Sequence, residues 1–145
     1  MGTASIRHIV EGNLVTMLQA EVGLTGTNIY PGDSTADSVM PKVVVVCDSA
    51  GTPSGLPDGL GNYDCQVRCV LHDNANDVTL TDHRAKAAAM VGALADVTAM
   101  AAQFTSNGDA ALYDVTVQSE DQGLDEQTGA WATVLRLSVV CVLAP

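Results

Sequence analysis

Residues 63–71 read Tyr-Asp-Cys-Gln-Val-Arg-Cys-Val-Leu, and apolar and polar side chains alternate along most of this stretch. A period of two is typical of a strand with one face against a core. The core face would carry Tyr63, Cys65, Val67, Cys69 and Leu71. Asp64, Gln66 and Arg68 would lie on the opposite face. This stretch is therefore the clearest half-buried strand in the chain.

Two further strands are predicted at residues 42–48 (Lys-Val-Val-Val-Val-Cys-Asp) and 131–143, and both are apolar on each face. One face of the last strand would carry Trp131, Leu135, Leu137, Val139 and Cys141. The other face would carry, around Arg136 and Ser138, the side chains of Ala132, Val134, Val140 and Val142. Two helices of a small domain would leave one such face open, so the pattern predicts contact between subunits.

Two amphipathic helices are predicted, at residues 4–22 and 79–104. Ser5 or Thr3 would cap the first helix and Gly23 would end it. In the second helix, capped by Thr79 or Thr81 and stopped by residues 106–108, the apolar stripe would be Met90, Leu94, Val97, Ala101 and Phe104.

The remaining segments are predicted to be two long loops and a closing hairpin. Residues 25–41 and 49–62 are rich in Gly, Pro, Ser and Asp, which is typical of loops. A strand at 112–117 and a turn at 120–129 would lead into the last strand. The order of elements predicts a single α+β domain over residues 1–145, with a mostly antiparallel four- to five-stranded sheet and two helices packed on it.

The charge of the chain limits its partners. Seventeen acidic against six basic residues give a formal charge of −11, which argues against binding nucleic acid through phosphate neutralisation and against anionic membranes. The first residues contain Arg7 and Glu11 and no unbroken apolar run, so neither a signal peptide nor a membrane span is predicted. We expect an intracellular protein.

The four cysteines are expected to pack in the core. Cys65 and Cys69 have the spacing of a metal-binding pair, but on a strand they would lie about 13 Å apart, too far to share one zinc ion. All four lie in apolar runs, where free cysteine is commonly buried. The prediction is that the protein has no metal and no cofactor.

No catalytic site is predicted. His72 beside Asp73 and His83 beside Asp82 could in principle form a general base with its orienting carboxylate. Neighbouring side chains on a strand or helix point in different directions, which disfavours both pairs. The favoured interpretation is ordinary polarity at the end of a strand and the start of a helix.

An acidic group at residues 120–126 comprises Glu120, Asp121, Asp125 and Glu126. These residues lack the ligand pattern of an EF-hand, so a solvated hairpin tip is favoured over a calcium site. The same tip would present negative potential to a partner.

Five stretches spread over nearly the whole chain match the character and order of one family. They are an opening helix with Ile6, Ile9 and Leu14, a Met40-Pro41-Lys42 entry into a valine strand, a loop leading to the strand at 63–71, a helix beginning near His83 with Ala85 and Ala88, and a closing strand at 131–139. In these features the chain resembles the tail-terminator and neighbouring head-tail joining (neck) proteins of long-tailed bacteriophages.

The resemblance implies a structural virion subunit that forms a hexameric ring, caps the tail tube and joins it to the head connector. Its partners would be copies of itself, the tail tube protein and a neck or connector protein, assembled in the host cytoplasm. DNA would pass through the ring without sequence-specific binding, which suits an acidic subunit. The family has no catalytic residues to transfer, so no enzyme is implied.

Contacts with neighbouring subunits or with the tube are expected from the last strand, the loop at 49–62 and the acidic turn. The candidate residues are Trp131, Arg136, Val140, Val142, Leu56, Leu60, Glu120, Asp121, Asp125 and Glu126.

Three alternatives stay open. The long 49–62 loop and the scarcity of aromatic residues also suit a head-side stopper or a baseplate component. A regulatory module that binds a small molecule or a protein would need a pocket with convergent polar groups. An enzyme using His72 or His83 is the least favoured.

Overall fold

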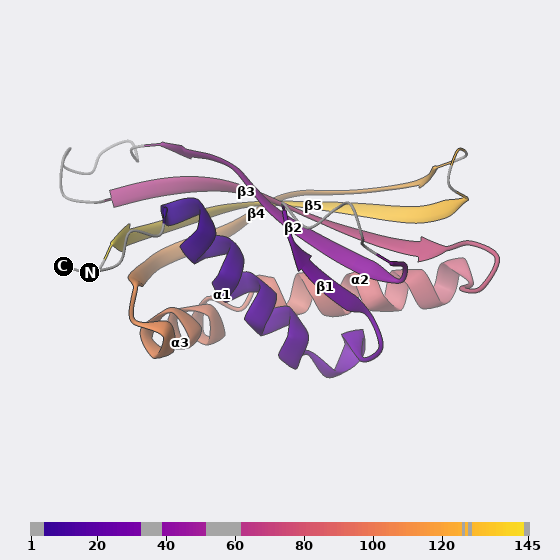
Figure 1. The fold of residues 1–145 in the computed structure, drawn as a ribbon, viewed down its shortest axis with the longest axis horizontal. Coiled ribbons are helices and arrows are strands. Elements are labelled where there is room, and N and C mark those ends of the chain that lie inside the picture. Colours follow the sequence, from indigo (N-terminus) through magenta and orange to yellow (C-terminus); the bar gives the residue numbers. More distant parts are fainter. Residues whose placement is uncertain (1–4, 33–38, 52–61, 126, 128, 144–145) are drawn as a thin grey trace.

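The computed structural model of the protein describes residues 5–32, 39–51, 62–125, 127 and 129–143. These residues form one five-stranded sheet, three α-helices and a short 3-10 helix. The elements are α1 (Ile6–Ala20), η1 (Val22–Leu24), β1 (Asn28–Pro31), β2 (Lys42–Gly51), β3 (Asn62–Asn74), α2 (Leu80–Leu94), α3 (Val97–Asn107), β4 (Ala110–Asp125) and β5 (Ala130–Leu143). Figure 1 shows the helices as a layer on one side of the sheet.

The sheet is mixed, with the strand order β1-β2-β3-β5-β4. The β2–β3, β3–β5 and β5–β4 pairs are antiparallel, and β1 pairs with β2 in parallel. The predicted α+β class and mostly antiparallel sheet are therefore confirmed. The prediction of two helices was wrong, because the described chain has three α-helices.

Strand β1 lies inside the stretch that the sequence predicted to be a loop at 25–41. It has four residues, ends at Pro31 and forms one edge of the sheet beside Lys42–Val45. Proline has no N–H to donate to a ladder, so it is tolerated at an edge. So short a strand ending in proline carries too little alternation to be predicted from sequence.

Helix α1 begins as predicted and ends earlier. The Ser5 side chain accepts a hydrogen bond from the His8 backbone N–H at 3.2 Å, which caps the helix. The C-cap is Glu21, so the prediction that Gly23 ends the helix was wrong. Gly23 instead lies against α2, where a Cβ atom would come 2.5 Å from the Cβ of Ala89. Only glycine fits this approach.

The second predicted helix is two helices. Helix α2 ends at Leu94, and Asp96 begins α3 by accepting a hydrogen bond from the Ala99 backbone N–H at 3.0 Å. The two helix axes are bent by 65°. In the part of the chain that the structure describes, no single helix is long and apolar enough to cross a bilayer; α2 and α3 reach that length only as this bent pair.

The break also changes which residues α3 buries. Val97 was predicted to face the core, but it is 41% exposed, whereas Met100 and Phe104 are fully buried. Helix α3 begins anew at its Asp96 cap, so the buried positions of α3 do not continue the helical spacing of those in α2. Gly108, with φ of 85°, ends α3 in the left-handed conformation, as predicted for the stop at 106–108.

The closing hairpin is longer than predicted. Strand β4 continues through the acidic and Gly-containing stretch to Asp125, where a turn had been predicted at 120–129. Two β-bulges, between Leu112 and Asp114 and between Val117 and Ser119, each add a residue without breaking the pairing with β5. Pairing with the strongly apolar β5 thus outweighs the weak strand propensity of residues 118–125.

The core lies between the helices and one face of the sheet, and it is built from aliphatic and sulfur-containing side chains around Phe104. All four cysteines are free and buried. The core face predicted for residues 63–71 is confirmed, since Cys65, Val67, Cys69 and Leu71 are buried and Tyr63 is partly buried.

Candidate functional site

The uncovered face of the sheet is the main candidate surface. Along β5 the odd-numbered positions Thr133, Leu135, Leu137, Val139 and Cys141 are fully buried under the helices. The even-numbered positions between them point to the other side, where Arg136 is exposed and its apolar neighbours are partly exposed. No described helix lies on that side (Figure 1). The second apolar face of this strand is therefore covered by none of the helices that the structure describes.

Two arginines face each other at the centre of this uncovered face. Arg68 of β3 is the direct cross-strand partner of Arg136 of β5. Like charges at directly opposed positions destabilise a sheet. Arg68 is paired with Asp48, with Nη2 and Oδ1 3.3 Å apart. Arg136 has no hydrogen bond or ion pair with any residue that the structure describes.

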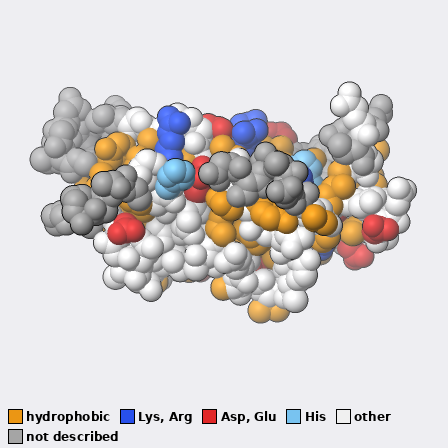
Figure 2. Space-filling view, in the orientation of Figure 1, with side chains coloured by type: hydrophobic (Ala, Val, Ile, Leu, Met, Phe, Trp, Pro, Cys, Tyr) orange, Lys and Arg blue, Asp and Glu red, His pale blue; other side chains and the backbone are white. Residues whose placement is uncertain are grey.

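Valines surround the arginine pair. The register places on the uncovered face Val44, Val46, Val70, Val134, Val140 and Val142. On the same face, Asp64 accepts hydrogen bonds from Ser138 at 2.6 Å and from Gln66 at 3.0 Å. Figure 2 shows most of the visible Lys and Arg side chains along the upper side of the molecule, above the helix layer. The surface is thus a field of valines around two arginines, with Asp64 on it and Asp114 and Asp121 of β4 along its margin.

A second exposed stripe lies on the helix side of β4, the other edge strand of the sheet. It consists of Val117, Glu120 and Leu124, whose partners on β5 all belong to the core face of that strand. Val117 is 37% exposed and Leu124 is 47% exposed. Helix α2 reaches this part of β4 through the hydrogen bond from Arg84 Nε to Gln122 Oε1 at 3.2 Å.

The acidic residues do not form the predicted hairpin tip. Glu120 and Asp121 lie within β4, on opposite faces of the sheet, opposite Leu135 and Val134. Asp125 is the last residue of that strand. The prediction was wrong because the strand continues past the expected turn.

Three predicted contact residues, Glu126, Leu56 and Leu60, lie outside the described residues, as does most of the predicted loop at 49–62. Trp131 lies on the helix side of β5. Its indole Nε1 donates a hydrogen bond to the Val78 carbonyl at 3.2 Å, so the ring holds the segment before α2.

A buried polar network lies at the start of α2, and the sequence did not predict it. His83 Nδ1 lies 2.6 Å from Asp73 Oδ2, and His83 Nε2 lies 2.7 Å from Thr133 Oγ1. Lys86 Nζ donates to the other oxygen of Asp73 at 2.8 Å. His83, Asp73 and Thr133 are all fully buried. This network joins α2, β3 and β5, and Lys86, whose side chain is 22% exposed, is its partly exposed member.

One sequence signal points to the burial of His83. The buried positions of α2 are His83, Ala87, Met90 and Leu94, at spacings of four, three and four. His83 therefore belongs to the same helical stripe as the apolar residues. The sequence cannot show that its partner, Asp73, lies ten residues earlier at the end of β3.

The cysteines pack as predicted in the core. Burial raises the pKa of Cys69 to about 12, so its thiol stays neutral at physiological pH. A hydrogen bond with Cys141 raises the pKa of Cys65 to about 12. Over the described ranges there is no group of three or more His, Cys, Asp or Glu side chains placed to hold a metal ion.

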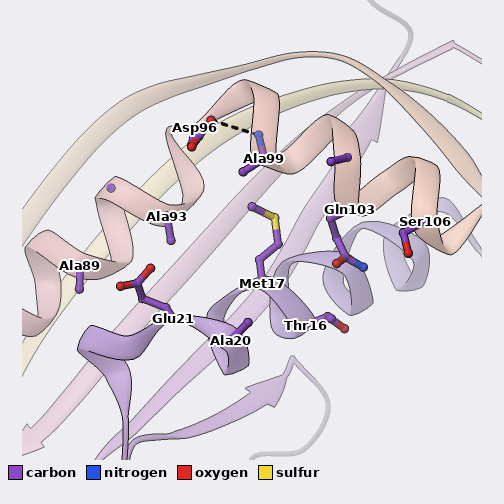
Figure 3. A pocket seen from close by; sticks show the side chains of 12 residues that line it. Thr16, Met17, Ala20, Glu21, Ala89, Ala93, Asp96, Ala99, Gln103 and Ser106 are labelled. Carbon is purple, nitrogen blue, oxygen red and sulfur yellow. Dashed lines mark hydrogen bonds between the residues drawn. The ribbon is translucent and has the colours of Figure 1, made fainter.

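A groove of about 740 Å³ separates α1 from α2 and α3. Figure 3 shows Met17 pointing from α1 toward the break between α2 and α3. Small side chains form much of its walls, including Ala20, Ala89, Ala93, Ala99 and Ala102. Its carboxylates serve the helix ends, since Asp96 caps α3 and Glu21 accepts a hydrogen bond from the Gly23 N–H.

The same fold occurs in a solved virion. A chain from the virion of a native gene transfer agent particle superimposes with a TM-score of 0.64, over 92% of this chain and 94% of that chain. The two sequences are 13% identical, so the likeness shows a shared fold. No protein-family model and no curated protein matches the sequence.

Proposed function

We propose that this chain is a non-catalytic structural subunit of a phage-type virion, acting as a tail terminator that forms a ring, caps the tail tube and joins it to the head connector. The observation that carries the proposal is the uncovered apolar face with Arg136 at its centre, because such a face calls for a protein partner. The likeness in fold to a gene transfer agent virion chain supports a place in a particle of that kind.

The acidic balance of the chain supports a ring through which DNA passes. With a formal charge of −11, the subunit would repel the phosphate backbone rather than hold it. The partners in this proposal are further copies of the chain, the tail tube protein and a neck or connector protein. The uncovered face and the exposed helix side of β4 offer separate surfaces for them.

The tail-capping role is tested by adding the purified, gold-labelled protein to tail-tube subunits that are polymerising. A terminator stops growth, so tube length should become limited and label should appear at one end of each tube. Label along the whole tube would instead identify a tube subunit. Tubes of unchanged length without label would contradict the capping role.

A second candidate is a protein-binding module that uses the groove between α1 and the α2–α3 pair. The observation that favours it is the wall of small side chains, which would let a partner helix approach closely. Introducing bulk at the wall through Ala93→Trp would block such a partner. The same substitution should leave ring formation by the uncovered face unchanged, which separates the two candidates.

A further inference from the structure

Two surfaces whose central residues carry opposite charge lie on opposite sides of the sheet; Arg136 and Glu120 are exposed, and the valines beside Arg136 are partly buried. The first, named the basic patch, consists of Val134, Arg136 and Val140 on the uncovered face of β5. The second, named the acidic stripe, consists of Val117, Glu120 and Leu124 on the helix side of β4. Each surface has one charged residue between two apolar residues.

The spacing of the two surfaces matches. In the basic patch the arginine lies two positions from one valine and four positions from the other. The members of the acidic stripe pair with Leu137, Leu135 and Trp131 of β5, which are also two and four positions apart. The bulge at Gln118 absorbs the additional residue of β4. In both surfaces the charge therefore lies about 7 Å from one apolar side chain and about 13 Å from the other.

We propose that the acidic stripe of one copy docks on the basic patch of the next copy, so that Glu120 pairs with Arg136. This inference rests on the proposed ring and names the contact that builds it. Because the two surfaces differ and lie on opposite sides of the sheet, the contact is heterologous, and its repetition builds a ring when the rotation from one copy to the next closes, or an open filament when it does not. The flanking valine and leucine side chains become buried in the same contact.

The unequal state of the two central arginines supports this pairing. Arg68 already has Asp48 as a counter-ion, whereas its cross-strand partner Arg136 has none within the described chain. A carboxylate from outside would relieve the repulsion between the two guanidinium groups. Glu120 supplies that carboxylate, and Val117 and Leu124 on the same face of β4 would exclude water from the pair.

Pairing through the edge of β4 is disfavoured by the strand itself. The bulges at Tyr113 and Gln118 interrupt its outer row of hydrogen-bonding groups. Exposed acids also lie along it, among them Asp114 and Asp121. Bulges and charges of this kind protect an edge strand from adding another strand. The face of the sheet is therefore the better surface for a neighbouring copy.

The test uses two single charge reversals, Arg136→Glu and Glu120→Arg, in the full chain. Each places like charges across the proposed contact, so each alone should reduce ring formation at least about tenfold. An equimolar mixture should restore rings in which the two variants alternate. Glu120 of the first variant then meets Arg136 of the second, and the arginine introduced at position 120 of the second meets the glutamate introduced at position 136 of the first. The double variant Arg136→Glu/Glu120→Arg should also form rings. Arg7→Glu, an exposed charge reversal on α1, is the matched control and should leave assembly unchanged.

The readout is mass in solution by light scattering, with circular dichroism to verify that each variant is folded. Loss of rings in each single variant and their return in the mixture support the inference. Rings in both single variants would overturn the Glu120–Arg136 contact while leaving the proposed ring intact. The contact would also be overturned if the single variants form no rings and neither the equimolar mixture nor the double variant restores them. A wild-type protein that forms no ring would overturn the ring and this contact together.

Discussion

Asp73 and His83 are joined in the core, with Oδ2 of Asp73 2.6 Å from Nδ1 of His83. The other oxygen of Asp73 accepts a hydrogen bond from Lys86 Nζ at 2.8 Å. One buried carboxylate therefore ties the end of β3 to the first turns of α2. Removing one member of a buried ionic network leaves the others without partners, which is a large cost to stability.

We expect Asp73→Asn to lower the free energy of unfolding by about 3 kcal/mol or more, since it removes the charge that faces His83 and Lys86. Urea unfolding followed by circular dichroism measures this change. Asp77→Asn, an exposed change of the same kind close by, should stay within about 0.5 kcal/mol of the wild type. Similar values for the two variants would show that the network does not stabilise the fold.

Because α3 begins as a separate helix, we expect shortening Met100 and shortening Val97 to lower the free energy of unfolding by different amounts. Met100→Ala should lower the free energy of unfolding by about 2–5 kcal/mol, because Met100 is fully buried. Val97→Ala should cost less than about 1 kcal/mol, because Val97 is 41% exposed. Thermal and urea unfolding of both variants give the comparison. A larger cost at Val97 than at Met100 would favour one continuous helix.

The hydrogen bond between the Glu11 side chain and the backbone of β2 is expected to stabilise the fold. The Glu11 Oε2 atom accepts this buried hydrogen bond from the Cys47 N–H at 2.7 Å, next to the bulge between Cys47 and Ser49. Glu11→Ala should cost about 1–3 kcal/mol, since it leaves that N–H without an acceptor. Glu11→Gln keeps an acceptor and should cost less. Equal losses in the two variants, measured by urea unfolding, would argue against this role.

Because Cys69 is buried, we expect the protein to lose stability at high pH. Burial raises the pKa of Cys69 from 9.0 to about 12, so the neutral thiol is favoured in the folded state. The stabilising effect is complete below pH 9 and is lost as the pH rises toward 12, because the unfolded chain releases this proton first. Cys69→Ala removes the effect. Urea unfolding under reducing conditions should therefore show a weaker decline above pH 9 in the variant, and parallel curves would contradict this assignment.

Local periodicity in the sequence predicted the elements that pack by a single regular pattern. Alternation placed β3 and its core face correctly, and the Ser5 and Thr79 caps placed the helix starts. The sequence failed where tertiary pairing decides the outcome. Strand β1 is fixed by its parallel partner β2, and the distal part of β4 is held in strand form by β5.

The sequence predicted only part of the candidate surface, because the pairing of strands decides the rest. The apolar pattern on both faces of the last strand indicated an uncovered surface that includes Arg136 and Val140. Its pairing with Arg68 depends on the register between β3 and β5, which the sequence does not show. Val117 and Leu124 were missed as an exposed stripe because their exposure follows from the edge position of β4.

The central claim is that this chain assembles into a ring through its uncovered face. The most direct test is the mass of the wild-type protein in solution by light scattering over a range of concentrations, with negative-stain images of the same samples and of samples mixed with tail tubes. We predict closed rings of about six copies, free or on the tube end. A monomer at every concentration, with no ring in the presence of tubes, would contradict the account.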